Sequence, residues 1–193
     1  MSISILIPTL PARRDNFAML LHHLQEQIRN NKAEHRVEIL FDATPQGKIT
    51  IGEKRQRLIE RARMDYVVFI DDDDWVSHDY IESVLHGIKS NPDCIGIVGW
   101  YYVDGTYQKP FRHSIYCGVD NTGNPYFETS EEYKRCPNHL NPIKRTIANK
   151  FHFQLSNFGE DTDFAMQMFN AKVLQTEWTI DRVLYFYRYQ SNK

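Results

Sequence analysis

The sequence lacks the features that mark several common protein classes. It has only three cysteines, Cys94, Cys117 and Cys136, which lie far apart and form no zinc-binding pair. So few thiols, odd in number, do not predict a disulfide framework, and we expect a reducing, cytoplasmic setting. No run approaches the roughly 18 apolar residues that a membrane-spanning helix needs. Because no basic start is followed by an apolar stretch, we also expect no signal peptide.

The chain also lacks an excess of charge of either sign. Its 23 basic and 25 acidic side chains give a net charge of -2. The absence of a global basic field argues against a dedicated nucleic-acid binder, although a local basic patch would still bind one. The composition, 41% hydrophobic and 25% charged, is that of an ordinary globular protein. A chain of 193 residues suits one domain with a sizeable core.

Apolar residues follow two periodicities along the first half of the chain. Short apolar runs predict four strands, at residues 2–7, 37–41, 66–70 and 95–103. Apolar residues at helical spacing predict three helices, around 17–28, 51–62 and 81–88. Asp15 or Asn16 is the expected cap of the first helix. The run at 66–70 is apolar throughout, which is typical of a strand in the middle of a sheet.

This alternation of strands and helices predicts an α/β fold with a doubly wound, mostly parallel, Rossmann-like sheet. After residue 104, glycine and proline divide the chain into short, Tyr-rich stretches, which predict hairpins and loops. A last helix is expected from Glu160 onward, followed by a final strand around 183–187.

Polar residues follow three of the predicted strands. Pro8-Thr9 ends the first, Asp42 ends the second, and Asp71 ends the third. Right-handed crossovers place the carboxyl ends of parallel strands along one edge of a sheet. Ligands in such sheets bind at that edge, so we expect these residues to share one site.

Four consecutive carboxylates, Asp71, Asp72, Asp73 and Asp74, follow the third strand. Like charges this close raise one another's pKa and titrate together. A divalent cation relieves the repulsion, because Mg²⁺ and Mn²⁺ prefer oxygen ligands and commonly take carboxylates together with phosphate oxygens. If the run is extended, Asp71 and Asp73 share a face and point to one ligand. The alternative is a solvated acidic loop that caps a helix starting near Ser77.

Several stretches, in this order, carry a resemblance to a known family. They are ILIPT at 5–9, GEKR at 52–55, YVVFIDDDDW at 66–75, GED at 159–161 and LYFYR at 184–188. Together they resemble glycosyltransferase family 2, whose members have the GT-A fold. The resemblance implies a single GT-A-like domain over residues 1–193. Residues 1–104 would form its nucleotide-sugar-binding half and residues 105–193 its hairpin- and loop-rich acceptor half.

The resemblance also implies an activity and its residues. The family moves a sugar from a nucleotide-sugar, usually a UDP-sugar, to an acceptor hydroxyl with the help of Mn²⁺ or Mg²⁺. The expected nucleotide-sugar-binding residues are Pro8, Thr9, Asp42, Lys54, Arg55, Asp71 and Asp72. Asp71 and Asp73 correspond to the carboxylates of the family's DxD motif, which hold the ribose and the metal. Asp161 corresponds to the catalytic base of inverting members.

The chemistry accounts for these residue types. A nucleoside diphosphate leaves, so the site must stabilise growing phosphate charge, as a metal ion does. The nucleophile is a neutral hydroxyl, so a carboxylate must take its proton from the other side of the sugar. Glu160-Asp161 meets that demand from a distant part of the chain. The same acids would also stabilise the start of a helix through its dipole.

Two other functions remain open at this point. A nucleotidyltransferase needs a metal, acids and a parallel sheet, but usually has a glycine-rich, basic loop after its first strand. Here residues 10–14 are basic without a glycine. The other hypothesis is a non-catalytic module that binds a nucleotide or a sugar.

The sequence leaves the acceptor and one histidine open as well. The acceptor could be a polysaccharide, a lipid-linked glycan or a modified nucleobase, and the oligomeric state is undetermined. His139 lies in an unusual loop at 136–145. It could complete the metal shell, touch a phosphate, or simply be an exposed or hydrogen-bonded loop residue.

Overall fold

The first three strands form the parallel part of the sheet. A computed structural model describes residues 1–191. β1 (Ile3–Pro8) lies between β2 (Val37–Asp42) and β3 (Tyr66–Phe69), and it pairs with both in parallel. Every residue of β1 and β3 is buried, as expected for strands covered on both faces. The apolar runs therefore predicted these strands correctly.

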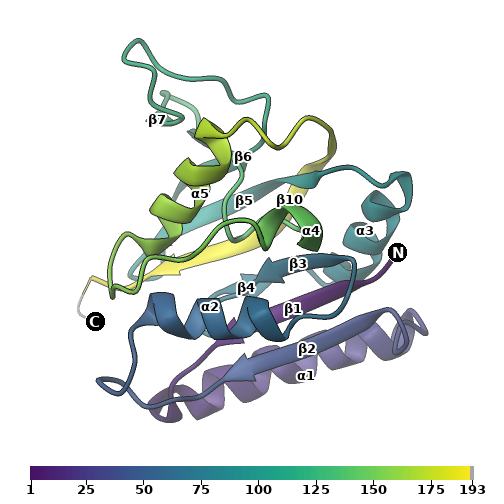
Figure 1. The fold of residues 1–193 in the computed structure, drawn as a ribbon. Helices are drawn as coiled ribbons and strands as arrows, with labels where there is room; N and C mark the ends of the chain where they lie inside the picture. The colour runs from purple at the N-terminus through teal and green to yellow at the C-terminus, as the bar shows by residue number, and fades with distance from the viewer. Residues whose placement is uncertain (192–193) are drawn as a thin grey trace.

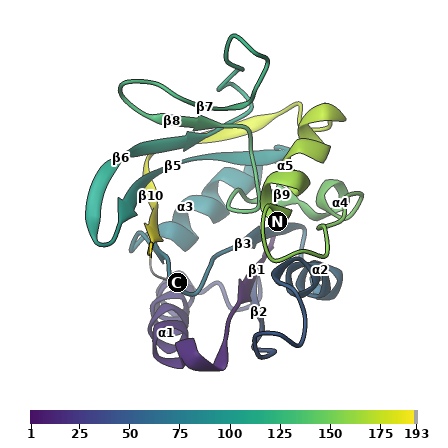
Figure 2. The ribbon, with the colours of Figure 1, turned by 90° about the vertical axis from the view of Figure 1, so that its left-hand side faces the viewer.

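Alternate side chains of β1 enter two separate cores. Ile3, Ile5 and Ile7 pack on one face of the sheet, and Leu6 packs on the other. The first core includes residues of α1 (Arg14–Asn30) and α3 (Tyr80–Gly87). The second includes residues of α2 (Ile51–Arg61), α4 (Arg145–Ala148) and α5 (Glu160–Asn170). Figure 2 shows α1 and α2 on opposite sides of the strands, which is the predicted doubly wound arrangement.

The start of α1 differs from the prediction. A 3₁₀ helix, η1 (Pro11–Arg13), leads directly into α1, whose first residue is Arg14. The N-cap is therefore Arg13, which makes no side-chain cap hydrogen bond, and the expected caps Asp15 and Asn16 already lie inside the helix. A second 3₁₀ helix, η2 (Ile88–Ser90), extends α3.

The other half of the sheet contains antiparallel pairs. The two-residue strand β9 (Ile143–Lys144) runs antiparallel between β3 and β5 (Cys94–Val103), so β3 and β5 point the same way. β5 continues into β6 (Thr106–His113) through Asp104 and Gly105. Both turn residues have positive φ, at 50° and 81°, as a two-residue hairpin turn of type I′ requires.

The last strand of the C-terminal half pairs with a strand of the N-terminal half. β8 (Tyr133–Arg135) pairs with β6, and β7 (Tyr126–Glu128) pairs with β8. β10 (Glu177–Tyr189) runs parallel to β5 and antiparallel to β4 (Trp75–Val76), the short strand after the acidic run. Figure 1 shows β10, in yellow, beside β5 across the middle of the molecule. The C-terminal strand is thus placed against the predicted site.

Two segments are more ordered than expected. β10 begins well before residue 183, and the stretch 136–145, expected as a loop, contains β9 and the first residue of α4. Of the helices within residues 1–191, none is long and apolar enough to cross a membrane.

Candidate functional site

The carboxyl ends of β1, β2 and β3 lie side by side, as the topology predicts. Pro8 pairs with Asp42 in the sheet register, and the backbone N–H of Thr9 donates to the carbonyl of Asp42 over 3.0 Å. Asp71 follows β3 by two residues, on the other side of β1. The structure therefore brings the predicted strand-end residues to one edge.

The acidic run forms a turn and is not extended. The N–H of Asp74 donates to the carbonyl of Asp71 over 3.1 Å. Nη1 of Arg13 lies 2.8 Å from a carboxylate oxygen of Asp72 and 3.3 Å from one of Asp73. The neighbouring acids Asp72 and Asp73 thus share the Arg13 guanidinium. The expectation of an extended segment, with alternate side chains on opposite faces, is therefore wrong.

Asp72 and Asp74 are buried inside the fold. Asp72 accepts a 2.7 Å hydrogen bond from Oγ1 of Thr9, which joins the acidic turn to the end of β1. Asp74 accepts from the hydroxyl of Tyr185 and from the N–H of Arg188, each at 2.7 Å. Burial, together with the charges of the neighbouring acids, raises the pKa of Asp74 well above its ordinary value. Because Asp72 and Asp74 are buried, the run is not the solvated loop that was the alternative. It also does not cap a helix at Ser77, because α3 begins at Tyr80.

Lys54 connects the loops that follow β1 and β2. Thr50 caps α2 by accepting from the N–H of Glu53 over 3.0 Å, and the helix then points the Lys54 side chain inward. Its ammonium group donates to the carbonyls of Thr9, at 2.6 Å, and Thr44, at 2.8 Å. Burial lowers the pKa of Lys54. The loop after β2 is also fixed by Asp42, which accepts from the N–H and hydroxyl of Thr44.

Arg55 bridges two acids from distant parts of the chain. Its Nη2 lies 3.0 Å from Oδ1 of Asp71, and its Nε lies 3.2 Å from Oε1 of Glu160. The guanidinium also stacks 5.3 Å from the ring centre of Phe69. Burial disfavours charge on Asp71, but Arg55 and then His139 outweigh it and hold its pKa well below the ordinary value. No sequence pattern identified Glu160 as a partner of Arg55, because the two lie 105 residues apart.

His139 lies between the acidic turn and the start of α5. Its Nε2 is 3.8 Å from Asp71 and its Nδ1 is 3.7 Å from Asp161. The side chain is 4% exposed, and within residues 1–191 neither ring nitrogen has a hydrogen-bond partner. Burial opposes ionisation of Asp161, but His139 and Arg55 outweigh it and keep its pKa below the ordinary value. Asp71 and Asp161 therefore face one another across a single imidazole.

The acids can hold a cation only together with other oxygens. Within residues 1–191 there is no group of three or more His, Cys, Asp or Glu side chains arranged to bind a metal. Oδ1 of Asp71 is buried, and the group 3.0 Å from it is Nη2 of Arg55. The carboxylates of Asp71 and Asp73 are chemically suited to Mg²⁺ or Mn²⁺, which usually takes one or two carboxylates and completes its shell with phosphate oxygens.

The family model described as "Glycosyl transferase family 2" matches residues 5–170, which include every predicted site residue. The chain belongs to glycosyl transferase family 2. The predicted family and the predicted enzyme class are confirmed. No curated protein sequence matches the chain.

Solved structures with the same fold include S. aureus TarS. The TarS 1–349 structure matches with a TM-score of 0.58 at 17% identity, over 97% of this chain and 60% of that chain. The same fragment in complex with UDP-GlcNAc matches with a TM-score of 0.58 at 15% identity, over 100% and 60%. Its complex with UDP gives 0.59 at 16%, over 97% and 60%. The chain thus spans 60% of those TarS chains, and the likeness confirms the mostly parallel GT-A fold.

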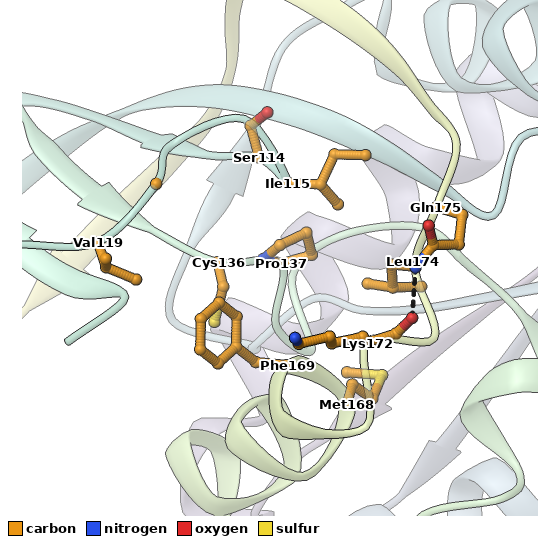
Figure 3. A pocket seen from close by; sticks show the side chains of 11 residues that line it. Ser114, Ile115, Val119, Cys136, Pro137, Met168, Phe169, Lys172, Leu174 and Gln175 are labelled. Atoms are coloured by element: carbon orange, nitrogen blue, oxygen red, sulfur yellow. Dashed lines mark hydrogen bonds between the residues drawn. The ribbon is translucent and has the colours of Figure 1, made fainter. Parts of the chain in front are cut away.

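A separate hollow is lined in part by Met168 and Phe169 near the end of α5. It has a cavity volume of about 290 Å³ and an apolar lining from Ile115, Val119, Met168, Phe169 and Leu174. Figure 3 shows these side chains around the opening, together with the contact between Gln175 and Lys172. None of the predicted site residues lines it. The hollow is therefore distinct from the strand-edge site.

Proposed function

We propose that this chain is a metal-dependent, inverting glycosyltransferase that moves a sugar from a UDP-sugar to an acceptor hydroxyl. The observation that carries the proposal is the placement of Asp71 and Asp161 on either side of His139, at 3.8 and 3.7 Å. One acid belongs to the strand edge where nucleotides bind in such sheets, and the other begins a helix opposite it. The TarS complexes with UDP-GlcNAc and UDP support a uridine nucleotide as the donor.

The donor half of the site would use the strand ends. Pro8, Thr9 and Asp42 offer backbone and carboxylate groups to the nucleoside, at the edge where β1 and β2 end. Lys54 and Arg55 provide positive charge behind that edge, although both already bind groups of the protein. Asp72 supports the edge through Thr9, and its direct contact with the donor remains a prediction.

Asp71 and Asp73 would hold Mn²⁺ or Mg²⁺ together with the donor's phosphates. The bound ion would neutralise the charge that grows on the leaving diphosphate. The low pKa of Asp71 keeps its carboxylate ionised, and the ion would share that carboxylate with Arg55, whose Nη2 lies 3.0 Å from Oδ1.

Asp161 is better suited to act as the base than its neighbour Glu160. The Glu160 carboxylate is 7% exposed and is bound to Arg55, whereas the Asp161 side chain is 32% exposed. A pKa below the ordinary value keeps Asp161 ionised at neutral pH, as a general base must be before it takes a proton. Glu160 holds Arg55 in place, and the partly exposed Asp161 is the acid that an acceptor can reach.

The reaction then follows from these positions. The acceptor oxygen forms a bond to the anomeric carbon and gives its proton to Asp161. The bond between that carbon and the diphosphate oxygen breaks, and the electron pair leaves with the nucleoside diphosphate. Attack from the side opposite to the leaving group inverts the anomeric configuration.

The decisive variant is Asp161→Asn, which keeps the shape of the side chain but removes its basicity. We expect donor binding, measured by calorimetry with Mn²⁺, to stay within about twofold and transfer to fall by about 10²- to 10⁴-fold. Asp163→Asn is the matched control, because Asp163 lies in the same first turn of α5 and its carboxylate accepts a 2.7 Å hydrogen bond from Gln167. Transfer by Asp161→Asn near the wild-type rate would overturn the assignment of the base.

The products and a donor screen separate the remaining functions. Release of a nucleoside diphosphate supports sugar transfer, release of pyrophosphate supports a nucleotidyltransferase, and no turnover supports a binding module. Thermal-shift measurements with Mn²⁺ and several nucleotide-sugars would identify the base and the sugar together. Acceptor assays should then include a polysaccharide, a lipid-linked glycan and a modified nucleobase.

A further inference from the structure

His139 is a buried imidazole whose hydrogen-bonding capacity is unused. It is 4% exposed, and neither Nδ1 nor Nε2 has a hydrogen-bond partner within residues 1–191. A buried polar group left without a partner carries the full cost of its lost hydration, so such groups in folded proteins usually have a use. Two carboxylates lie just beyond hydrogen-bonding distance, which points to a use in the reaction.

The backbone around His139 is held in place from several directions. Its carbonyl accepts from the N–H of Phe69 over 2.9 Å, which ties it to the end of β3. On either side, Asn138 accepts from the N–H of Leu140, and Asn141 donates to the carbonyl of Ile95. The ring also packs edge-on against Phe69 at 6.2 Å between centres. These contacts hold the backbone of His139, and with it the base of the imidazole, in a fixed place beside Asp161.

The two carboxylates beside the ring differ in what else holds them. Asp71 is already paired with Arg55 at 3.0 Å. Asp161 accepts from the N–H of Thr162 over 2.7 Å, and within residues 1–191 its one ion-pair contact closer than 4.0 Å is His139. Asp71 thus has an ion-pair partner besides the imidazole, whereas Asp161 has none among the described residues, so Nδ1 is the ring nitrogen on which the carboxylate of Asp161 depends.

We infer that His139 is a positioning residue, whose Nδ1–H closes on Oδ2 of Asp161 and holds that carboxylate toward the acceptor. The inference rests on the proposed role of Asp161 as the base. The present separation of 3.7 Å is consistent with it, because catalytic hydrogen bonds are often long before substrates bind and tighten in the reacting complex. His139 itself takes up no proton from the acceptor.

Two amides of different length test which nitrogen matters. In His139→Asn the amide NH₂ replaces Nδ1 and can still reach Asp161, whereas in His139→Gln it replaces Nε2 and points to Asp71. We expect His139→Asn to keep kcat within about threefold of wild type, while His139→Gln and His139→Ala lose about 10- to 100-fold. The KM for the donor should stay within about twofold in all three variants, because the proposed contact of His139 is with the base and not with the donor. Equal kcat for the Asn and Gln variants would refute the inference, as would wild-type kcat in His139→Ala.

A double variant separates this inference from the proposed function. If His139 acts through Asp161, adding His139→Ala to Asp161→Asn should cost less than about twofold in kcat beyond Asp161→Asn alone. A further loss of tenfold or more would show a role independent of Asp161 and overturn the inference. If Asp161→Asn itself transfers normally, the assignment of the base fails. If only the His139 variants behave as wild type, the inference alone fails. Unfolding temperatures of each variant identify losses that come from misfolding, and His139→Asn remains informative if His139→Ala does not fold.

Discussion

Nη2 of Arg55 lies 3.0 Å from Oδ1 of Asp71, and the two side chains are only 6% and 20% exposed. Arg55 comes from the first turns of α2, and Asp71 comes from the turn after β3. The same guanidinium reaches Glu160, the first residue of α5. One buried cation therefore fixes three elements around the proposed site.

Replacing Arg55 should destabilise the fold strongly. Arg55→Met leaves Asp71 and Glu160 buried without their counter-charge, and breaking a buried pair in this way costs about 3–5 kcal/mol. We expect that loss in the free energy of unfolding measured with denaturant. Arg55→Lys keeps the charge but cannot contact both acids through separate nitrogens, so its free energy of unfolding should lie between those of Arg55→Met and wild type.

Arg57→Met is the matched control for this experiment. Arg57 lies on the same helix and pairs with Glu53 at 2.7 Å, but the two side chains are 48% and 35% exposed. Such surface pairs contribute about 0–1 kcal/mol. Equal losses in the Arg55 and Arg57 variants would contradict a structural role for the buried bridge.

Asp93 should give the fold a measurable acid sensitivity away from the site. Burial opposes its ionisation, but hydrogen bonds from the N–H groups of Gln175 and Thr176 and from Lys144 hold its pKa below the ordinary value. Asp93→Asn removes the charge, and hydrogen bonds to charged groups contribute about 1.5–3 kcal/mol. We expect a loss of that order in the free energy of unfolding at neutral pH.

The pH dependence has a definite sign. A depressed pKa in the folded state makes the unfolded chain bind more protons, so this stabilisation is complete above the unfolded pKa of about 3.9 and disappears as the pH falls through the folded value. The stability difference between wild type and Asp93→Asn should therefore be constant from about pH 7 to 5 and shrink below about pH 4. Asp15→Asn, at an exposed position on α1, is the control. A difference that does not change with pH would show that hydrogen-bond geometry, and not charge, is responsible.

Transfer should require a divalent cation. We expect a chelator to abolish transfer and added Mn²⁺ or Mg²⁺ to restore it, because only carboxylates and donor phosphates are proposed to hold the ion. Asp73→Asn removes one proposed carboxylate, so the cation concentration for half-maximal rate should rise by about tenfold or more. Calorimetry of donor binding with and without Mn²⁺ provides a second readout.

Asp181→Asn tests whether any acid on the surface has the same effect. Asp181 lies in β10 with a side chain 76% exposed and pairs with Arg112. Its replacement should leave the cation requirement unchanged. Full transfer in the presence of chelator, or equal effects of the two variants, would contradict a metal site at Asp71 and Asp73.

The sequence predicted the elements whose patterns are long or strongly apolar. The runs before Pro8, Asp42 and Asp71 became β1, β2 and β3, because a strand buried on both faces must be apolar along its length. The edge on which Pro8, Asp42 and Asp71 meet also followed from topology, since parallel strands end on the same side. The family motifs then pointed to Asp161.

Sequence patterns could not predict the short elements and the polar strands. β9 has two residues and so cannot show a periodicity, yet it separates β3 from β5. The first part of β10 contains Glu177, Thr179 and Asp181, whose polarity hides the strand. The extended geometry assumed for the acidic run failed because the hydrogen bond from Asp74 to Asp71 closes a turn.

The sequence by itself determined which chemical groups the protein has and which strand ends carry them. Apolar periodicity and the order of strands and helices are local properties, so a reading along the chain recovers them. Only the tertiary structure decided which partners those groups have. Arg55 bridges to Glu160, and His139 lies between Asp71 and Asp161, through contacts that join residues far apart in the chain. Ion pairs depend on distance in space and on burial, and neither is written in the spacing of the residues.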